Sequence, residues 1–112
     1  MLLFNRLGTV LLLSAIAFAG CEDRRVFKYT IQGNSMEPVL KRGQTVMVVP
    51  YVKAPSVGDI VMVNNPDYGF PVAHRLEIID GAMIQTKGDA NKLYDRPLPK
   101  SAIIGQVFPI EQ

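Results

Sequence analysis

The sequence has one cysteine, one histidine and no tryptophan among its 112 residues. A single cysteine excludes an internal disulfide framework and a cysteine-based zinc cluster, and a single histidine excludes a metal site with several imidazole ligands. The net charge of +2 is too small, and the basic residues are too scattered, to favour a nucleic-acid partner. Any imidazole chemistry in this protein must therefore use His74.

The longest stretch without charge lies at the N-terminus, from Leu7 to Cys21, between Arg6 and the charged residues of "EDRR". A basic start, an apolar region and small residues at its end are typical of an export signal. The stretch is shorter than the about 20 residues that a membrane-spanning helix needs. We therefore divide the chain into an N-terminal membrane anchor or signal segment, residues 1–25, and a folded domain, residues 26–112.

Three interpretations of this segment stay open. It is a short, uncleaved apolar helix that anchors the chain, a signal peptide cleaved after Ala17-Phe18-Ala19, or a lipoprotein signal whose "FAGC" ends in a lipidated Cys21. A buried core helix is the structural alternative. Each of the three export interpretations places the remaining chain on the outer, extracytoplasmic face of the membrane.

From Val26 onward, short runs of apolar and β-branched residues are separated by glycine, proline and asparagine. Such runs predict β-strands, which we expect at residues 26–32, 44–51, 59–65, 72–80, 82–88 and 102–110. Asp80-Gly81 predicts a hairpin, because a tight type I′ turn needs positive φ at its centre. One helical turn is expected at 36–40, where Pro38 limits its length. Five or six strands in so short a chain predict an all-β fold, a small twisted barrel or sandwich-like sheet.

A candidate catalytic group begins with Ser35 in "GNSMEP", directly after the first predicted strand. A serine hydroxyl is a weak nucleophile and needs a base within hydrogen-bond reach, and His74 is a suitable base. A carboxylate on the other ring nitrogen would orient the imidazole, and Asp89 and Asp95 both lie in the loop "GDANKLYD". This spacing is compatible with a Ser-His-Asp triad.

Each of these residues also has a purely structural interpretation. Ser35 is then a turn serine, His74 a half-buried strand residue, and the two aspartates belong to a solvated loop. Lys41 and Lys87 are alternative bases, although a lysine would need burial to lose its proton near neutral pH.

The motifs "GNSMEPVLKRGQTVMVVP", "VGDIVMV", "AHRLEII", "TKGDANKLYD" and "IIGQV" resemble, in order, the conserved boxes of type I signal peptidases. The resemblance spans residues 26–107 and implies the sheet fold that signal peptidases share with LexA. His74 stands where most bacterial members carry lysine, which resembles the Ser-His-Asp subgroup of endoplasmic-reticulum, archaeal and spore-former enzymes. That subgroup has two aspartates six residues apart; by this resemblance Asp95 completes the triad, and Asp89 has a structural or assisting role.

The resemblance implies a membrane-associated serine endopeptidase that cleaves signal peptides from exported preproteins, with membrane lipid as a second partner and without a metal or organic cofactor. Gly33 departs from the pattern, because many bacterial members have a hydroxyl residue there that donates to the oxyanion hole. The hole would then rely on the Ser35 amide together with either neighbouring backbone or the Asn34 side chain, and Met36 packs near the cleft.

Two alternatives to this function remain. One is a Ser-Lys autoprotease like LexA, although the chain leaves no room for the DNA-binding domain of such repressors. The other is a catalytically inactive lipoprotein that uses the same fold as a binding module.

Overall fold

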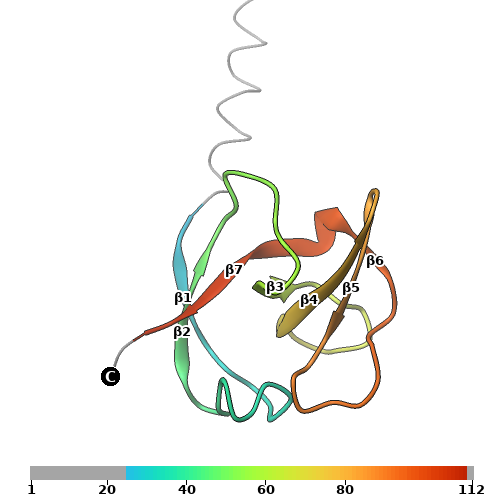
Figure 1. Ribbon diagram of the computed structural model, residues 1–112. Helices are drawn as coiled ribbons and strands as arrows, with labels where there is room; N and C mark the ends of the chain where they lie inside the picture. The colour runs from blue at the N-terminus through green and yellow to red at the C-terminus, as the bar shows by residue number, and fades with distance from the viewer. Residues whose placement is uncertain (1–24, 111–112) are drawn as a thin grey trace, which may run out of the picture.

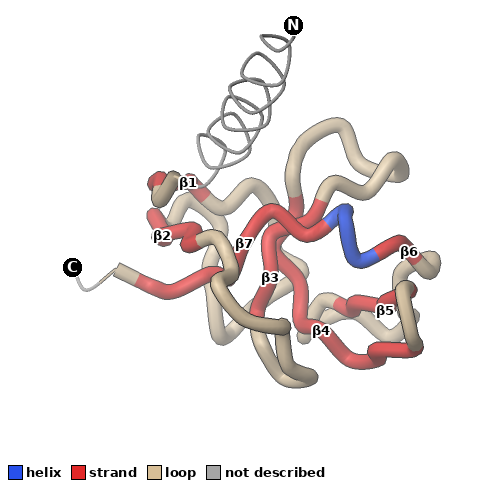
Figure 2. The backbone as a smooth tube through the Cα atoms, turned by 90° about the horizontal axis from the view of Figure 1, so that it is seen from above, coloured by secondary structure: helices blue, strands red, loops and turns tan. Residues whose placement is uncertain are grey.

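A single antiparallel sheet of seven strands forms the fold (Figures 1 and 2). The computed structural model describes residues 25–110. Their elements are β1 (Phe27–Thr30), β2 (Thr45–Val49), β3 (Ile60–Val63), β4 (Val72–Asp80), β5 (Met83–Lys87), β6 (Leu98–Pro99), the 3-10 helix η1 (Lys100–Ala102) and β7 (Ile103–Pro109). The strand order is β1-β2-β7-β3-β4-β5-β6, so β1 and β6 are the edge strands. The prediction of an all-β fold is confirmed.

The predicted strands all occur, most of them trimmed by one or two residues at each end. The hairpin between β4 and β5 also occurs, with Asp80 paired to Met83 and Gly81 at a φ of 61°. The predictions missed β6, whose two residues include a proline and form no readable pattern. The predicted turn at 36–40 is a single turn, in which the Leu40 N–H donates to the Met36 carbonyl at 2.9 Å.

Strand β3 lies near the middle of the sheet and is buried on both faces. Met62 packs into one apolar cluster, whereas Val61 and Val63 pack into another. Alternate residues of a strand point to opposite faces, so the two clusters lie on the two sides of β3. The first cluster contains Ile31, Met36, Leu40, Val46, Val48, Met62, Ala73 and Val107. The second contains Val61, Val63, Leu76, Ile84 and Leu98.

The predicted anchor or signal segment, residues 1–25, lies outside the described residues except for Arg25. Within residues 25–110, no helix is long and apolar enough to cross a membrane. The apolar N-terminal helix and the possible lipidation of Cys21 therefore stay predictions.

Candidate active site

Ser35 stands on the turn that follows β1, and buried neighbours hold this turn in place. Ile31 exchanges backbone hydrogen bonds with Gln44 and Gly43, which extends the pairing of β1 with β2. Met36 and Leu40 are 1% and 0% exposed, and both belong to the first apolar cluster. The core thus fixes the turn through Met36 and Leu40, while Ser35 itself is half-buried.

His74 is fully buried in β4, and the strand register fixes the face of the sheet on which it lies. It lies opposite Val61 of β3, and its second neighbour Leu76 lies opposite Thr86 of β5. Directly opposed residues share one face of a sheet, and so do residues two apart in a strand. His74 and Thr86 therefore point to the same side of the sheet, where the chain after β5 returns.

Ser35, His74 and Asp95 form a continuous row of hydrogen bonds. The Ser35 Oγ lies 2.9 Å from the His74 Nε2, and the His74 Nδ1 lies 2.6 Å from the Asp95 Oδ2. The Thr86 hydroxyl donates to the same carboxylate oxygen at 2.7 Å, and the Asp95 N–H donates to the Thr86 carbonyl at 2.9 Å. The fold thus brings together residues that are 39 and 21 positions apart in the sequence.

The protonation of Asp95 determines the direction of these bonds. Burial, the largest single effect, would raise the pKa of its carboxyl group, but the hydrogen bonds from His74, Thr86 and Tyr68 and the charge interaction with His74 together lower the pKa below its usual value. The ionised carboxylate only accepts hydrogen bonds, so the Nδ1 of His74 carries the proton. In the neutral imidazole, Nε2 is then the acceptor for the Ser35 hydroxyl.

Asp89 lies outside this row. The Arg75 Nε donates to its Oδ1 at 3.1 Å and the Arg75 Nη2 to its Oδ2, while the Asp89 N–H points to the Met36 sulfur at 3.3 Å. The hydrogen bond to Asp89 is the main cause that raises the pKa of the Arg75 guanidinium. Asp89 therefore contacts the turn that carries Ser35 without touching His74.

Gly88 packs directly against the backbone of Ser35. A Cβ atom added at this position would lie 2.7 Å from the Ser35 carbonyl oxygen and 2.8 Å from its Cβ. The same carbonyl accepts a hydrogen bond from the Ala90 N–H at 2.8 Å. This loop therefore packs directly against the Ser35 turn. Any side chain larger than that of glycine at residue 88 would force neighbouring atoms to shift.

We expect Gly88→Ala to lower the free energy of unfolding by about 1–3 kcal/mol, because backbone atoms must shift to admit the methyl group. Thermal unfolding of both proteins would measure the loss. Gly69→Ala is the matched control, since an added Cβ meets nothing within 4 Å there. Equal unfolding midpoints for Gly88→Ala and the unchanged protein would contradict this close packing.

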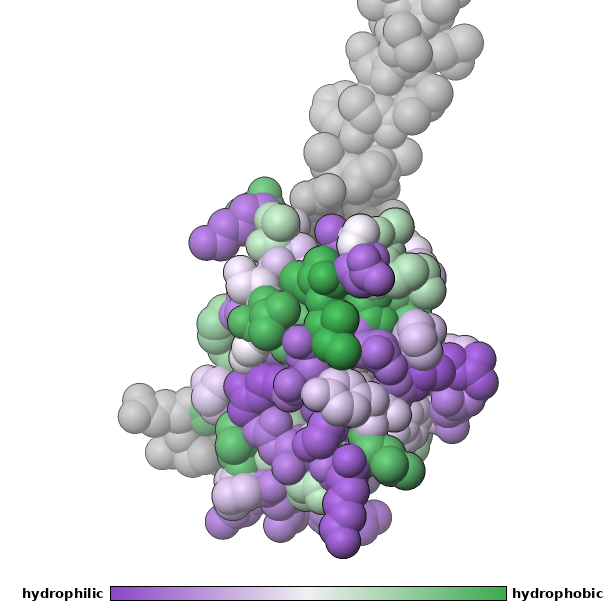
Figure 3. Space-filling model, turned by 45° about the vertical axis from the view of Figure 1, so that its right-hand side comes forward, coloured by the Kyte–Doolittle hydropathy of each residue, from purple (hydrophilic) through white to green (hydrophobic). Residues whose placement is uncertain are grey.

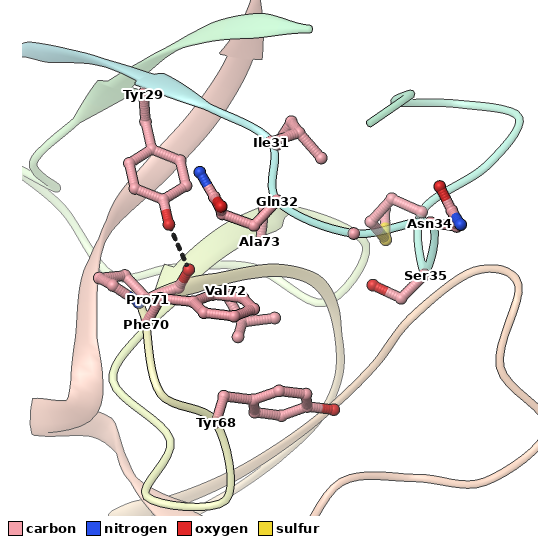
Figure 4. Close-up of a pocket in the computed structure, with 12 residues that line it drawn as sticks. Tyr29, Ile31, Gln32, Asn34, Ser35, Tyr68, Phe70, Pro71, Val72 and Ala73 are labelled. Carbon is pink, nitrogen blue, oxygen red and sulfur yellow. Dashed lines mark hydrogen bonds between the residues drawn. The ribbon is translucent and has the colours of Figure 1, made fainter. Parts of the chain in front are cut away.

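A cavity of about 150 Å³ opens next to the Ser35 hydroxyl. One wall is the end of β1 with the Ser35 turn, and the other is the segment that leads into β4 (Figure 4). The Tyr29 hydroxyl donates to the Pro71 carbonyl at 2.9 Å and joins the two walls at one end. The lining of the cavity is mostly apolar, with contributions from Tyr29, Ile31, Phe70, Pro71, Val72 and Ala73.

The residues predicted for the oxyanion hole lie around this cavity in different ways. The Ser35 hydroxyl points into the cavity, whereas the Asn34 side chain is turned away from it (Figure 4). Asn34 is thus not aimed at the space before Ser35, which differs from the expectation. The backbone N–H of Ser35 makes no hydrogen bond within residues 25–110 and is free to bind an oxyanion. An added Cβ at Gly33 would meet nothing within 4 Å, so a larger residue would fit there.

The two alternative bases lie elsewhere. Lys41 is exposed on a turn, and the Lys87 ammonium donates to the Gly88 carbonyl at 3.1 Å. Sequence reasoning missed Thr86 and Tyr68, both of which donate hydrogen bonds to Asp95. No local pattern marks either residue, because their roles depend on strand register and loop placement.

A serine hydroxyl, an imidazole and a carboxylate in one hydrogen-bonded row, beside an apolar cavity, are the arrangement found in the active sites of serine peptidases. The model of the Peptidase S24-like family matches residues 11–108 of this sequence, and the chain belongs to that family. It therefore carries a serine peptidase domain of the LexA/signal peptidase type. No curated protein matches the sequence.

Proposed function

We propose that this protein is a membrane-associated serine endopeptidase of the signal peptidase type, in the Ser-His-Asp subgroup, which cleaves signal peptides from exported preproteins. The observation that carries this proposal is the row from Ser35 through His74 to Asp95, open to a cavity at the serine. A histidine at this place distinguishes the site from the Ser-Lys arrangement of LexA-like autoproteases.

In the first step, the Ser35 Oγ attacks the carbonyl carbon of the scissile bond while its proton passes to the His74 Nε2. The ionised Asp95 stabilises the imidazolium, and the Ser35 N–H donates to the oxyanion. The C–N bond then breaks, His74 protonates the leaving amine, and an ester remains on Ser35. Water, activated by His74, hydrolyses this ester and releases the new carboxyl end.

Two free strand edges support the binding of an extended substrate. Among residues 25–110, strand β1 pairs only with β2. Val72 and Ala73 of β4 pair there only with β3, because the pairing with β5 begins at Arg75. These two edges line opposite walls of the cavity. A peptide that adds as a strand between them would place a peptide carbonyl beside Ser35.

The size and lining of the cavity suit small to medium-sized apolar side chains before the cut. At about 150 Å³ it accommodates alanine readily, and Phe70 and Val72 are among the apolar residues of its walls. Apolar walls without a charged residue also favour an uncharged side chain, since burial of an unpaired charge is costly. Both properties agree with an Ala-x-Ala sequence at the end of a signal peptide.

The end of the domain where the described chain begins supports contact with a membrane surface. Val26 is 55% exposed, and Val52 and Val57, in the loop between β2 and β3, are 92% and 59% exposed. Figure 1 places this loop next to the start of β1, and Figure 3 shows apolar side chains gathered in the upper part of one face. Exposed apolar groups at one end are suited to a lipid surface.

The test is cleavage of a preprotein reporter by the full-length protein in membranes. We expect cleavage directly after an Ala-x-Ala sequence, located by mass spectrometry of the products. A matched reporter with aspartate as the last residue before the cut should be cleaved at least about tenfold more slowly, because its carboxylate would be buried without a partner against apolar walls. Equal rates for the two reporters would contradict the assigned pocket.

The alternative function, an inactive lipoprotein that uses the fold for binding, predicts a different result. It predicts lipid attached to Cys21 and no cleavage of any reporter. Lipidation together with cleavage that depends on Ser35 would instead describe an active, lipid-anchored peptidase.

A further inference from the structure

Tyr68 contacts the catalytic row and the cavity together. It lies in the loop between β3 and β4, and its hydroxyl donates to the Asp95 Oδ1 at 3.3 Å. Its ring stands edge-on to the His74 imidazole, with the centroids 5.7 Å apart and an interplanar angle of 88°. The same ring lines the cavity, where Figure 4 shows its hydroxyl end extending toward the side of Ser35.

The two oxygens of Asp95 have different partners. His74 and Thr86 both donate to Oδ2, while Tyr68 donates to Oδ1. The Asp95 side chain is only 7% exposed, so a lost donor is not simply replaced by bulk water. Burial, followed by the charge of Asp95, raises the pKa of the Tyr68 hydroxyl, which therefore stays protonated and able to donate.

The loop that carries Tyr68 is tied to the chain beside Asp95. The Tyr68 N–H donates to the Asn65 carbonyl at 3.0 Å in a tight turn. Arg96, next to Asp95, donates two hydrogen bonds to Asp67 at 2.9 and 2.7 Å. The loop that carries the Tyr68 ring and the segment that carries the Asp95 carboxylate are thus fixed relative to each other.

We propose that Tyr68 is a positioning residue of the reaction: its hydroxyl orients Asp95, its ring orients His74, and its place in the cavity exposes it to the bound peptide. A side chain that enters the cavity packs against the ring and presses it toward His74 and Asp95. Occupancy of the cavity is thereby linked to the alignment of the base. This inference rests on the proposed function.

The test compares Tyr68→Phe, which removes only the hydroxyl, with Tyr94→Phe on a neighbouring exposed tyrosine. We expect Tyr68→Phe to lower kcat for the reporter about tenfold, the effect of losing one hydrogen bond to a charged group, with KM within about twofold of the unchanged protein. Tyr94→Phe should leave both constants unchanged. Tyr68→Leu, which also removes the ring, should raise KM as well.

A second measurement does not depend on cleavage. The chain has one histidine, so the imidazole signals in an NMR spectrum of the full-length protein report on His74 alone. We expect Tyr68→Phe to shift the Nδ1 proton signal and to speed its exchange with water about tenfold, and Tyr94→Phe to change neither.

If Tyr68→Phe leaves the Nδ1 proton signal of His74 unchanged, or changes that signal while kcat stays the same, the positioning role of Tyr68 is overturned. If the unchanged protein cleaves no reporter, the proposed function fails, and the imidazole signal still decides whether Tyr68 orients the His74–Asp95 pair.

Discussion

Replacing Ser35 by alanine is expected to reduce cleavage of the preprotein reporter by roughly 10⁴- to 10⁶-fold, the loss typical of removing a serine nucleophile. The hydroxyl lies 2.9 Å from the only histidine of the chain and points into the cavity, so the methyl group of alanine leaves His74 with nothing to activate. The backbone of residue 35 keeps its hydrogen bond from the Ala90 N–H. The fold should therefore be kept, although the buried His74 loses its partner at Nε2, which should lower the free energy of unfolding by about 1–3 kcal/mol.

The matched control is Ser101→Ala, which changes an exposed serine of η1 and should leave the rate unchanged. His74→Ala should lose about as much activity as Ser35→Ala, and the double variant hardly more, because the two side chains act as one unit. Cleavage that persists in Ser35→Ala would show that another group attacks the substrate and would refute the assignment of the nucleophile.

Replacing Asp95 by asparagine is expected to reduce the rate by roughly 10³- to 10⁴-fold. Asparagine has nearly the same shape but no charge, so it stabilises the imidazolium poorly. Its amide group can also donate to Nδ1, which would reverse the tautomer and leave Nε2 protonated toward Ser35. The measurement is the rate of reporter cleavage, with circular dichroism to verify that the sheet is retained.

Asp89→Asn is the internal control for this prediction, since it changes the other aspartate of the same loop. The pair with Arg75 is partly exposed, at 27% and 21% of the two side chains, and such pairs contribute about 1 kcal/mol or less. We expect a loss of no more than about fivefold in rate. A larger loss from Asp89→Asn than from Asp95→Asn would reverse the roles of the two carboxylates.

The strands of this protein can be predicted from its sequence because their signal is local. A short run rich in apolar and β-branched residues predicts β4 with its observed bounds, Val72–Asp80, and the glycine of Asp80-Gly81 predicts the hairpin that follows. Strand β6 gives no such signal, since two residues are too few for a period. Its place in the sheet depends on pairing with β5.

The candidate site likewise has residues that could be predicted from the sequence and residues whose roles could not. Ser35 and His74 could be proposed from the sequence, because a nucleophile and a base are recognisable by residue type and a single histidine leaves one choice. Asp95 and Asp89 could not be separated by chemistry, and the resemblance to signal peptidases alone favoured Asp95. The structure separates them by their partners, His74 for Asp95 and Arg75 for Asp89.

By itself, the sequence determined the strand pattern, the turn at Ser35 and the residue types available for chemistry, since each depends on neighbours a few positions away. Only the tertiary structure decided which carboxylate meets the imidazole, and that Thr86 and Tyr68 hold it there. Those contacts join residues 9 to 27 positions apart. They exist because the registers of β3, β4 and β5 place His74 and Thr86 on one face of the sheet. The loops at the end of that face bring Tyr68 and Asp95 to the same place.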